Sequence, residues 1–151
     1  MLEPGRSLVA DACVLVSRVL GAKSNGGKFP SIHSHRILQF IYIFSHPPPP
    51  PAPPPTPLPG KQFLVVTAAM TELIRPALYS AYHHIAYASP PTAAATATYD
   101  VVGPVCESGD FLGKDRVLHV PDDGARVVVF DVGAYGFSMS SNYNMRCRAA
   151  E

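Results

Sequence analysis

The sequence has 151 residues, of which 47% are hydrophobic and 15% charged, and its formal net charge is +1. The length allows one ordinary domain, and the near-neutral charge removes the electrostatic basis for binding nucleic acid or an anionic membrane. No apolar run approaches the ~20 residues that a membrane-spanning helix needs, and the three widely spaced cysteines, Cys13, Cys106 and Cys147, fit neither a disulfide framework nor a zinc cluster.

The distribution of proline divides the chain into three parts. Ten of the 17 prolines lie between Pro47 and Pro59, and such a run lacks the backbone donors of a helix or sheet and favours polyproline II. We therefore expect an N-terminal piece over residues 1–23, a Pro-rich disordered insert over 24–60 and a C-terminal block over 61–151. A connection of this length is unusual inside a compact domain, which indicates an insertion such as translated non-coding sequence.

Short strands and helices are predicted on both sides of this insert. The N-terminal piece has the pattern of a short apolar helix from Leu8 that passes into an alternating strand over 14–19. In the C-terminal block we expect a strand over 61–66, a short helix over 71–79 broken by Pro76, and strands over 99–105 and 125–132, with turn residues at 121–124. The expected fold is mainly β with short helices.

Four motifs stand in order along the two outer parts of the chain. They are Glu-Pro-Gly-Arg at 3–6, Met-Thr-Glu-Leu-Ile-Arg-Pro-Ala-Leu-Tyr at 70–79, Gly-Pro-Val-Cys-Glu-Ser-Gly-Asp at 103–110 and Gly-Ala-Tyr-Gly-Phe-Ser-Met-Ser at 133–140. Together they resemble the C-terminal half of the diaminopimelate decarboxylase family, lyases that use pyridoxal 5'-phosphate (PLP) to convert meso-2,6-diaminopimelate into L-lysine and CO2.

The resemblance covers about 1–23 and 61–151 and has no counterpart for the insert. It implies an incomplete C-terminal β-barrel or sandwich domain, in which 1–23 is a remnant of the end of the PLP-binding (β/α)8 barrel and most of that barrel is missing. It also implies a homodimer that acts on a small amino acid, located in the plastid if the source is a plant and in the cytoplasm otherwise.

The first motif is a candidate for binding the cofactor phosphate. Glu3, Pro4 and Gly5 precede a helix start, where free N–H groups favour an anion, although an ordinary helix cap has the same pattern. The resemblance implies that Glu3, Pro4, Gly5 and Arg6 bind PLP, that Arg6 also contacts substrate, and that Tyr135 contacts PLP. Without the resemblance, we would interpret Tyr135 as an aromatic residue of the core.

The second and third motifs supply the candidate substrate residues. Arg75 and Tyr79 are four residues apart, so a helix presents them on one face, where a guanidinium and a phenol suit a carboxylate; a snorkelling arginine has the same spacing. Cys106 is either a proton donor or a small buried residue. The resemblance implies that Arg75 and Tyr79 grip the substrate carboxylate, that Cys106 returns a proton to the α-carbon and that Glu107 contacts substrate, the last two in the partner subunit's site.

Two expected absences and one alternative complete the predictions. PLP chemistry requires a lysine that forms a Schiff base, and the resemblance places it in the barrel, so this chain lacks it and is expected to be inactive alone. His33, His35 and His46 have no supporting carboxylate or cysteine, and the adjacent pair at 83–84 points apart, so we expect no metal. A different class of function is a non-catalytic interaction protein whose run 47–59 binds an SH3 or WW module.

Overall fold

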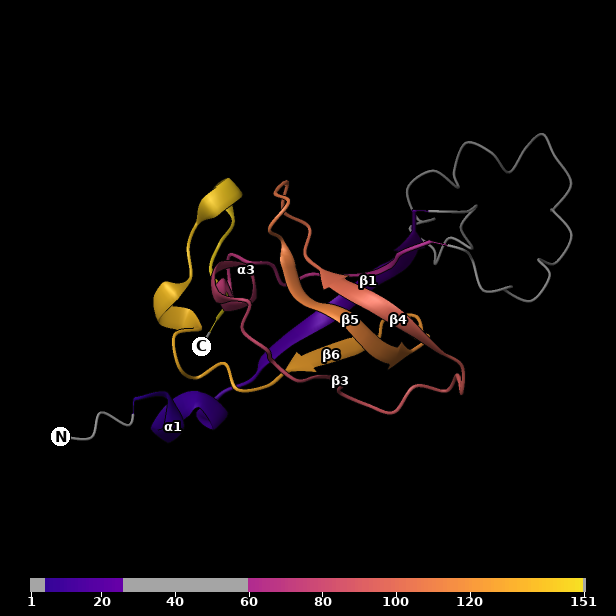
Figure 1. Cartoon of the computed structure of the whole chain (residues 1–151), viewed down its shortest axis with the longest axis horizontal. Coiled ribbons are helices and arrows are strands. Elements are labelled where there is room, and N and C mark those ends of the chain that lie inside the picture. The colour runs from indigo at the N-terminus through magenta and orange to yellow at the C-terminus, as the bar shows by residue number, and fades with distance from the viewer. Residues whose placement is uncertain (1–4, 26–59, 151) are drawn as a thin grey trace, which may run out of the picture.

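The computed structural model describes residues 5–25 and 60–150, and most of them form one sheet with short helices at its end (Figure 1). The strands are β1 (Leu15–Ser24), β2 (Gln62–Val66), β3 (Ile85–Tyr87), β4 (Thr96–Val102), β5 (Phe111–His119) and β6 (Arg126–Val129). The helices are α1 (Arg6–Val9) and α3 (Arg75–Tyr79), with 3₁₀ turns η1 (Ala10–Ala12), η2 (Phe137–Met139) and η3 (Tyr143–Met145). The predicted fold class, mainly β with short helices, is confirmed. None of the described helices is long and apolar enough to span a membrane.

The sheet is mixed and almost closes on itself. Its strand order is β3-β6-β1-β2-β4-β5, and every neighbouring pair is antiparallel except β2 and β4. The two edge strands approach each other, because the Tyr87 hydroxyl donates a hydrogen bond of 2.8 Å to the carbonyl oxygen of His119. The result is a barrel-like sheet around a single core.

The core follows the period-two alternation of the strands. The side chains without any exposed surface come from four strands and from the loop before α3: Leu64, Val66, Ala69, Leu73, Val101, Leu112, Val127 and Val129. On the central strand β1, Ser17 and Val19 are buried, whereas Val16 and Leu20 are exposed on the opposite face. One face of the sheet therefore encloses the core.

Several predicted boundaries are wrong. The helix expected over 71–79 begins only at Arg75, and Pro76 opens it instead of breaking it, since the first turn of a helix does not need the missing N–H. The first strand continues to Ser24 instead of ending at residue 19, the strand expected over 99–105 is β4, and the strand expected over 125–132 covers only 126–129. The sequence pattern did not predict β3 and β5.

The residues that flank the undescribed segment 26–59 pair with each other. Ser24 is opposite Gln62 in the ladder of β1 and β2. The Asn25 amide donates to the carbonyl of Lys61 at 3.1 Å, and the Lys61 amide donates to Asn25 Oδ1 at 2.8 Å. Residues 1–4 and 26–59 lie outside the described residues. The second range includes the polyproline run and His33, His35 and His46, which we expect not to bind a metal.

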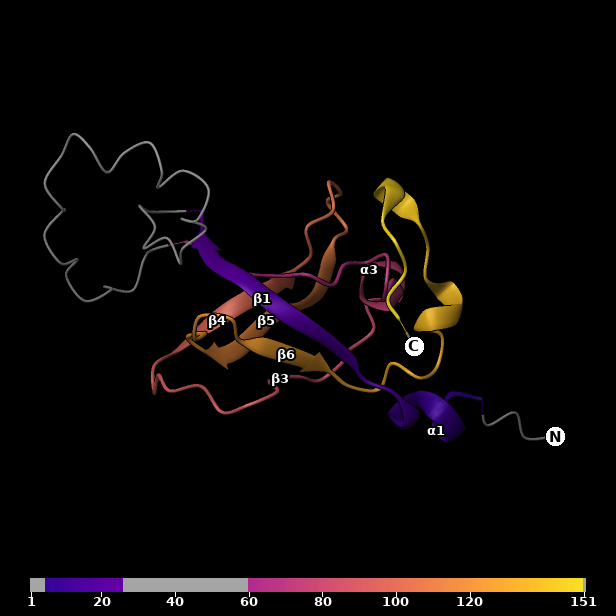
Figure 2. The same ribbon diagram turned by 180° about the vertical axis from the view of Figure 1, so that it is seen from behind.

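The helices gather at the other end of the sheet. In both views α1, α3 and the C-terminal segment lie on the side where β1 begins, away from the point where β1 ends (Figures 1 and 2). The loop between β4 and β5, residues 103–110, rises beside α3 and the C-terminal segment. These elements carry all the described residues that the motifs single out.

Candidate functional site

Arg75 forms the centre of one cluster. It is the first residue of α3 and is only 9% exposed. Its Cζ atom lies 5.7 Å from the ring centroid of Tyr79 and 6.0 Å from that of Tyr135. In the described part of the chain no residue forms an ion pair or a hydrogen bond with its guanidinium. A guanidinium with its donors uncommitted is suited to a carboxylate from outside the domain.

Tyr135 reaches Arg75 because the backbone around it is unusual. It has a left-handed φ of 62° and is 51% exposed, so the reading as a core aromatic is wrong. Gly133, two residues before it, has no room for a side chain, since a Cβ atom there would collide with the carbonyl oxygen of Val9. The turn from 133 to 136 therefore directs the phenol away from the core.

The N-terminal piece is attached to the same turn. The Gly133 amide donates to the carbonyl of Ala10 at 3.0 Å, and the Val132 amide donates to that of Cys13 at 3.2 Å. These bonds place α1, which carries the exposed Arg6, against the segment that leads to Tyr135. Of the predicted phosphate-binding residues only Gly5 and Arg6 are described; Glu3 and Pro4 lie outside the described residues.

Cys106 and Glu107 form a second cluster in the loop between β4 and β5. Both side chains are exposed, so Cys106 is not the buried hydrophobe of the alternative interpretation. The Tyr143 hydroxyl donates a hydrogen bond of 3.2 Å to Glu107 Oε2. This hydrogen bond and the negative charge of Glu107 both raise the pKa of Tyr143. Sequence reasoning missed Tyr143, because the contact depends on the turn η3 and joins residues 36 positions apart.

The C-terminal segment holds this tyrosine in place. The Ser141 amide donates to the carbonyl of Thr71 at 2.9 Å. Arg146 Nη2 donates to the carbonyl of Thr67 at 2.8 Å and lies 3.8 Å from the Glu72 carboxylate. The segment that carries Tyr143 is thus fastened along the loop that precedes α3, which links the two clusters through the backbone.

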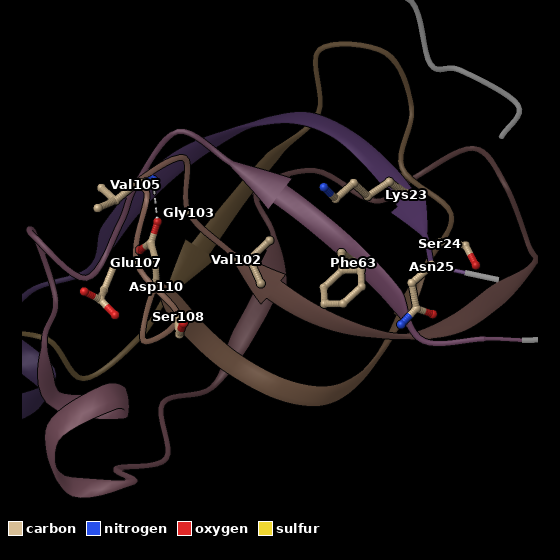
Figure 3. A pocket seen from close by; sticks show the side chains of 10 residues that line it. All are labelled: Lys23, Ser24, Asn25, Phe63, Val102, Gly103, Val105, Glu107, Ser108 and Asp110. Atoms are coloured by element: carbon tan, nitrogen blue, oxygen red, sulfur yellow. Dashed lines mark hydrogen bonds between the residues drawn. The ribbon is translucent and has the colours of Figure 1, made fainter. Parts of the chain in front are cut away.

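A pocket of about 380 Å³ lies at the side of the Cys106 loop (Figure 3). Its lining comes from the end of β1, the start of β2, the end of β4 and the loop itself: Lys23, Ser24, Asn25, Phe63, Val102, Gly103, Val105, Glu107, Ser108 and Asp110. Glu107 is the one predicted site residue among them, so the pocket is not where Arg75, Tyr79 and Tyr135 meet.

The two adjacent histidines point in different directions, as predicted. His83 is buried with Nδ1 2.9 Å from the carbonyl oxygen of Phe130, whereas His84 is exposed with its ring 5.4 Å from that of Phe130. Residues 5–25 and 60–150 contain no group of three or more histidine, cysteine, aspartate or glutamate side chains that could hold a metal ion.

The sequence of residues 8–133 matches the model of the pyridoxal-dependent decarboxylase, C-terminal sheet domain. The chain belongs to this family. A probable chloroplastic diaminopimelate decarboxylase of rice is 46% identical over the whole of this chain, and the diaminopimelate decarboxylase of a serogroup A strain of Neisseria meningitidis is 42% identical over the same length. The Helicobacter pylori diaminopimelate decarboxylase, solved in complex with L-lysine, superposes on 97% of the chain with a TM-score of 0.68 and 34% identity.

The chain spans about a quarter of the length of those relatives: 24% of the rice protein, 29% of the Neisseria protein and 27% of the Helicobacter chain. Its described residues fit one side of a PLP site, since Arg6 offers an exposed cation for a phosphate and Tyr135 a half-exposed phenol. Two of the lysines contact other residues: the Lys61 ammonium forms an ion pair of 2.8 Å with Asp100, and the Lys114 ammonium lies 4.0 Å from the centroid of the Phe111 ring.

Proposed function

We propose that the chain is the C-terminal part of a diaminopimelate decarboxylase, which converts meso-2,6-diaminopimelate into L-lysine and CO2. Relatives with this name, 46% and 42% identical over the whole chain, support the substrate assignment. The observation that carries the proposal is the buried Arg75, whose guanidinium lies 5.7 and 6.0 Å from the centroids of two tyrosine rings and pairs with no carboxylate of the described residues. The remaining three quarters of the enzyme, including the barrel, would come from outside this sequence.

The substrate has two carboxylates, of which one leaves as CO2 and one stays. In the proposed mechanism Arg75 and Tyr79 hold the carboxylate that stays, because a planar guanidinium and a phenol on one helix face can bind it together. Glu107, held by the Tyr143 hydroxyl, would receive an ammonium group of the substrate bound in the partner's site, so that the two subunits of a homodimer bind opposite ends of one substrate. Charge complementarity at both ends then fixes which α-carbon reacts.

PLP would supply the electron sink for the departing carboxylate, and Glu3, Pro4, Gly5, Arg6 and Tyr135 would hold it on this side. In the proposed mechanism Arg6 also contacts the substrate. After the loss of CO2 the α-carbon needs a proton. Cys106, exposed next to Glu107, is the proposed donor, and in a homodimer it would act in the partner's site.

The compartment is proposed from relatives. The rice protein is named chloroplastic, and the other relatives named above are bacterial. We infer a plastid location for a plant source and the cytoplasm otherwise.

The test is a chimera that joins residues 1–25 and 60–150 to the barrel of the rice relative, assayed for CO2 release and lysine formation. Cys106→Ala should lower kcat by about 10²–10⁴-fold, the usual contribution of a positioned acid, with little change in KM. Arg75→Ala should mainly raise KM, because the contact it loses is present throughout the reaction. Cys147→Ala, which removes another exposed cysteine, is the control and should behave like the parent.

Mixed dimers test the arrangement of the site. A Cys106→Ala chimera combined with a chimera that lacks the barrel lysine should recover activity, because one site per dimer then has both groups. An inactive parent chimera would contradict the proposed function. Full kcat in Cys106→Ala, or no recovery in the mixture, would contradict the role or the placement of the thiol.

A further inference from the structure

Asp110 connects the two segments that carry the candidate site. It is 5% exposed and lies at the end of the loop between β4 and β5. Its Oδ1 accepts the Met70 amide at 2.7 Å and its Oδ2 accepts the Val105 amide at 2.6 Å, the second bond being visible in Figure 3. Val105 directly precedes Cys106, and Met70 begins the turn that leads to Arg75. One carboxylate thus holds both segments.

The packing around this carboxylate leaves no space. At Gly103 a Cβ atom would lie 2.5 and 2.6 Å from the two Asp110 oxygens and 2.7 Å from the Cα of Ala69. At Gly109 a Cβ atom would lie 3.7 Å from Ala77, a residue of α3. The contact near α3 is thus an ordinary van der Waals contact, whereas at Gly103 the loop approaches Asp110 and the turn before α3 too closely for any side chain.

The other two buried carboxylates in the described residues, Glu72 and Asp100, each accept one backbone amide. Glu72 accepts the Ala69 amide at 2.7 Å and so closes its own turn. Asp100 accepts the Asp115 amide at 3.0 Å and pairs with Lys61. Asp110 differs from them because it accepts two backbone amides from two motifs, that of Met70, 40 positions away, and that of Val105, 5 positions away.

We propose that Asp110 is a positioning residue, which fixes the turn of Cys106 and Glu107 relative to the turn that leads to Arg75. The proposal rests on the proposed function, because it gives these turns their roles. Each carboxylate oxygen serves one amide, and an amide side chain in its place would offer one acceptor and one donor, so it could support only one turn. If Cys106 works in the partner's site, Asp110 also couples the geometry of the two sites in a dimer.

Hydrogen exchange of the full 151-residue chain tests the anchor. In the unchanged protein the amides of Met70 and Val105 should exchange at least about tenfold more slowly than that of Cys106, the factor expected for a charge-assisted hydrogen bond. Asp110→Asn should speed exchange by about 10–100-fold at one or both amides, and Asp100→Asn should not. Equal exchange at the three amides of the unchanged protein would overturn the proposal even if the variant did not fold.

Kinetics in the rice-barrel chimera separate positioning from stability. Asp110→Asn should lower kcat by about 10–100-fold, as expected when a proton donor is misplaced, and Asp110→Glu, which keeps both acceptor oxygens, should lower it less. Asp100→Asn, with a similar loss of thermal stability, should leave kcat unchanged. Equal kcat in the variants at 110 and 100 would show a structural role only and overturn the proposal. An inactive parent chimera would count against the proposed function, and exchange alone would then decide whether Asp110 is the anchor.

Discussion

Deleting residues 26–59 and joining Asn25 to Gly60 should stabilise the domain by about 2 kcal/mol. The two ends already pair through the hydrogen bonds between Asn25 and Lys61 and through the register of Ser24 with Gln62. The new junction leaves a three-residue loop of Asn25, Gly60 and Lys61 between the paired residues Ser24 and Gln62, which is a common hairpin length, and Gly60 has a positive φ. The deletion shortens the connection roughly tenfold, which is slightly more than three doublings at about 0.6 kcal/mol each.

Urea and thermal unfolding of the two proteins provide the assay. The gain corresponds to a rise in Tm of about 6–8 °C, since the unfolding entropy is about 2.1 cal/mol/K per residue. The urea m-value should not change, because a segment that only closes a loop buries no surface. A control in which a Gly/Ser linker of equal length replaces residues 26–59 should match the parent. A deletion variant that is less stable, or has a clearly smaller m-value, would refute the reasoning, because residues 26–59 would then be packed against the domain.

The remaining predictions concern one site contact, one pH effect and the core. Tyr143→Phe removes the hydroxyl that supports Glu107 and should raise KM of the chimera by about 2–10-fold; an unchanged KM would contradict that role. Burial raises the pKa of Tyr87 above its ordinary 10.0, so the stability that this residue provides is complete below about pH 10 and is lost at higher pH, where the unfolded chain ionises first. In urea titrations across that range, Tyr87→Phe should flatten the decline, and an equally steep decline would argue against this source. Leu64→Ala, at a fully buried position, should cost about 2–5 kcal/mol in urea unfolding, whereas Leu20→Ala, 43% exposed, should cost under about 1; similar losses would mean that the core is wrongly placed.

The strands that follow a simple pattern were predictable and the irregular ones were not. The β-branched run before Thr67 indicated β2 because its side chains alternate in a half-buried sheet. β5 contains Gly113, Lys114 and Asp115, the last with a φ of 53°, and its ladder with β4 has register shifts. Such irregularities interrupt the period of two on which strand prediction depends. β3 has three residues, too few for any periodicity.

The candidate site shows the same limit. Helical spacing was enough to place Tyr79 beside Arg75, since residues four positions apart are about one turn apart on the same face of a helix. The approach of Tyr135 to Arg75 depends on a left-handed residue in a turn, and the bond from Tyr143 to Glu107 depends on the return of the C-terminal segment. Neither leaves a trace in local sequence, because each is a tertiary contact between segments that have no common period.

The exposure of the candidate site residues is a second reason to expect that this chain is inactive alone, besides the lysine that the proposed enzyme would carry in its barrel. Tyr79, Tyr135 and Tyr143 are 60%, 51% and 48% exposed, and Cys106 is exposed as well. Fixed dipoles and positioned acids are most effective where water is excluded and the local dielectric is low, and a solvated surface provides neither condition. In the proposed enzyme a second surface must therefore cover these side chains, and a lysine introduced into this chain by mutation would bind PLP in open solvent. In the proposed enzyme the barrel would supply this enclosing surface as well as the lysine.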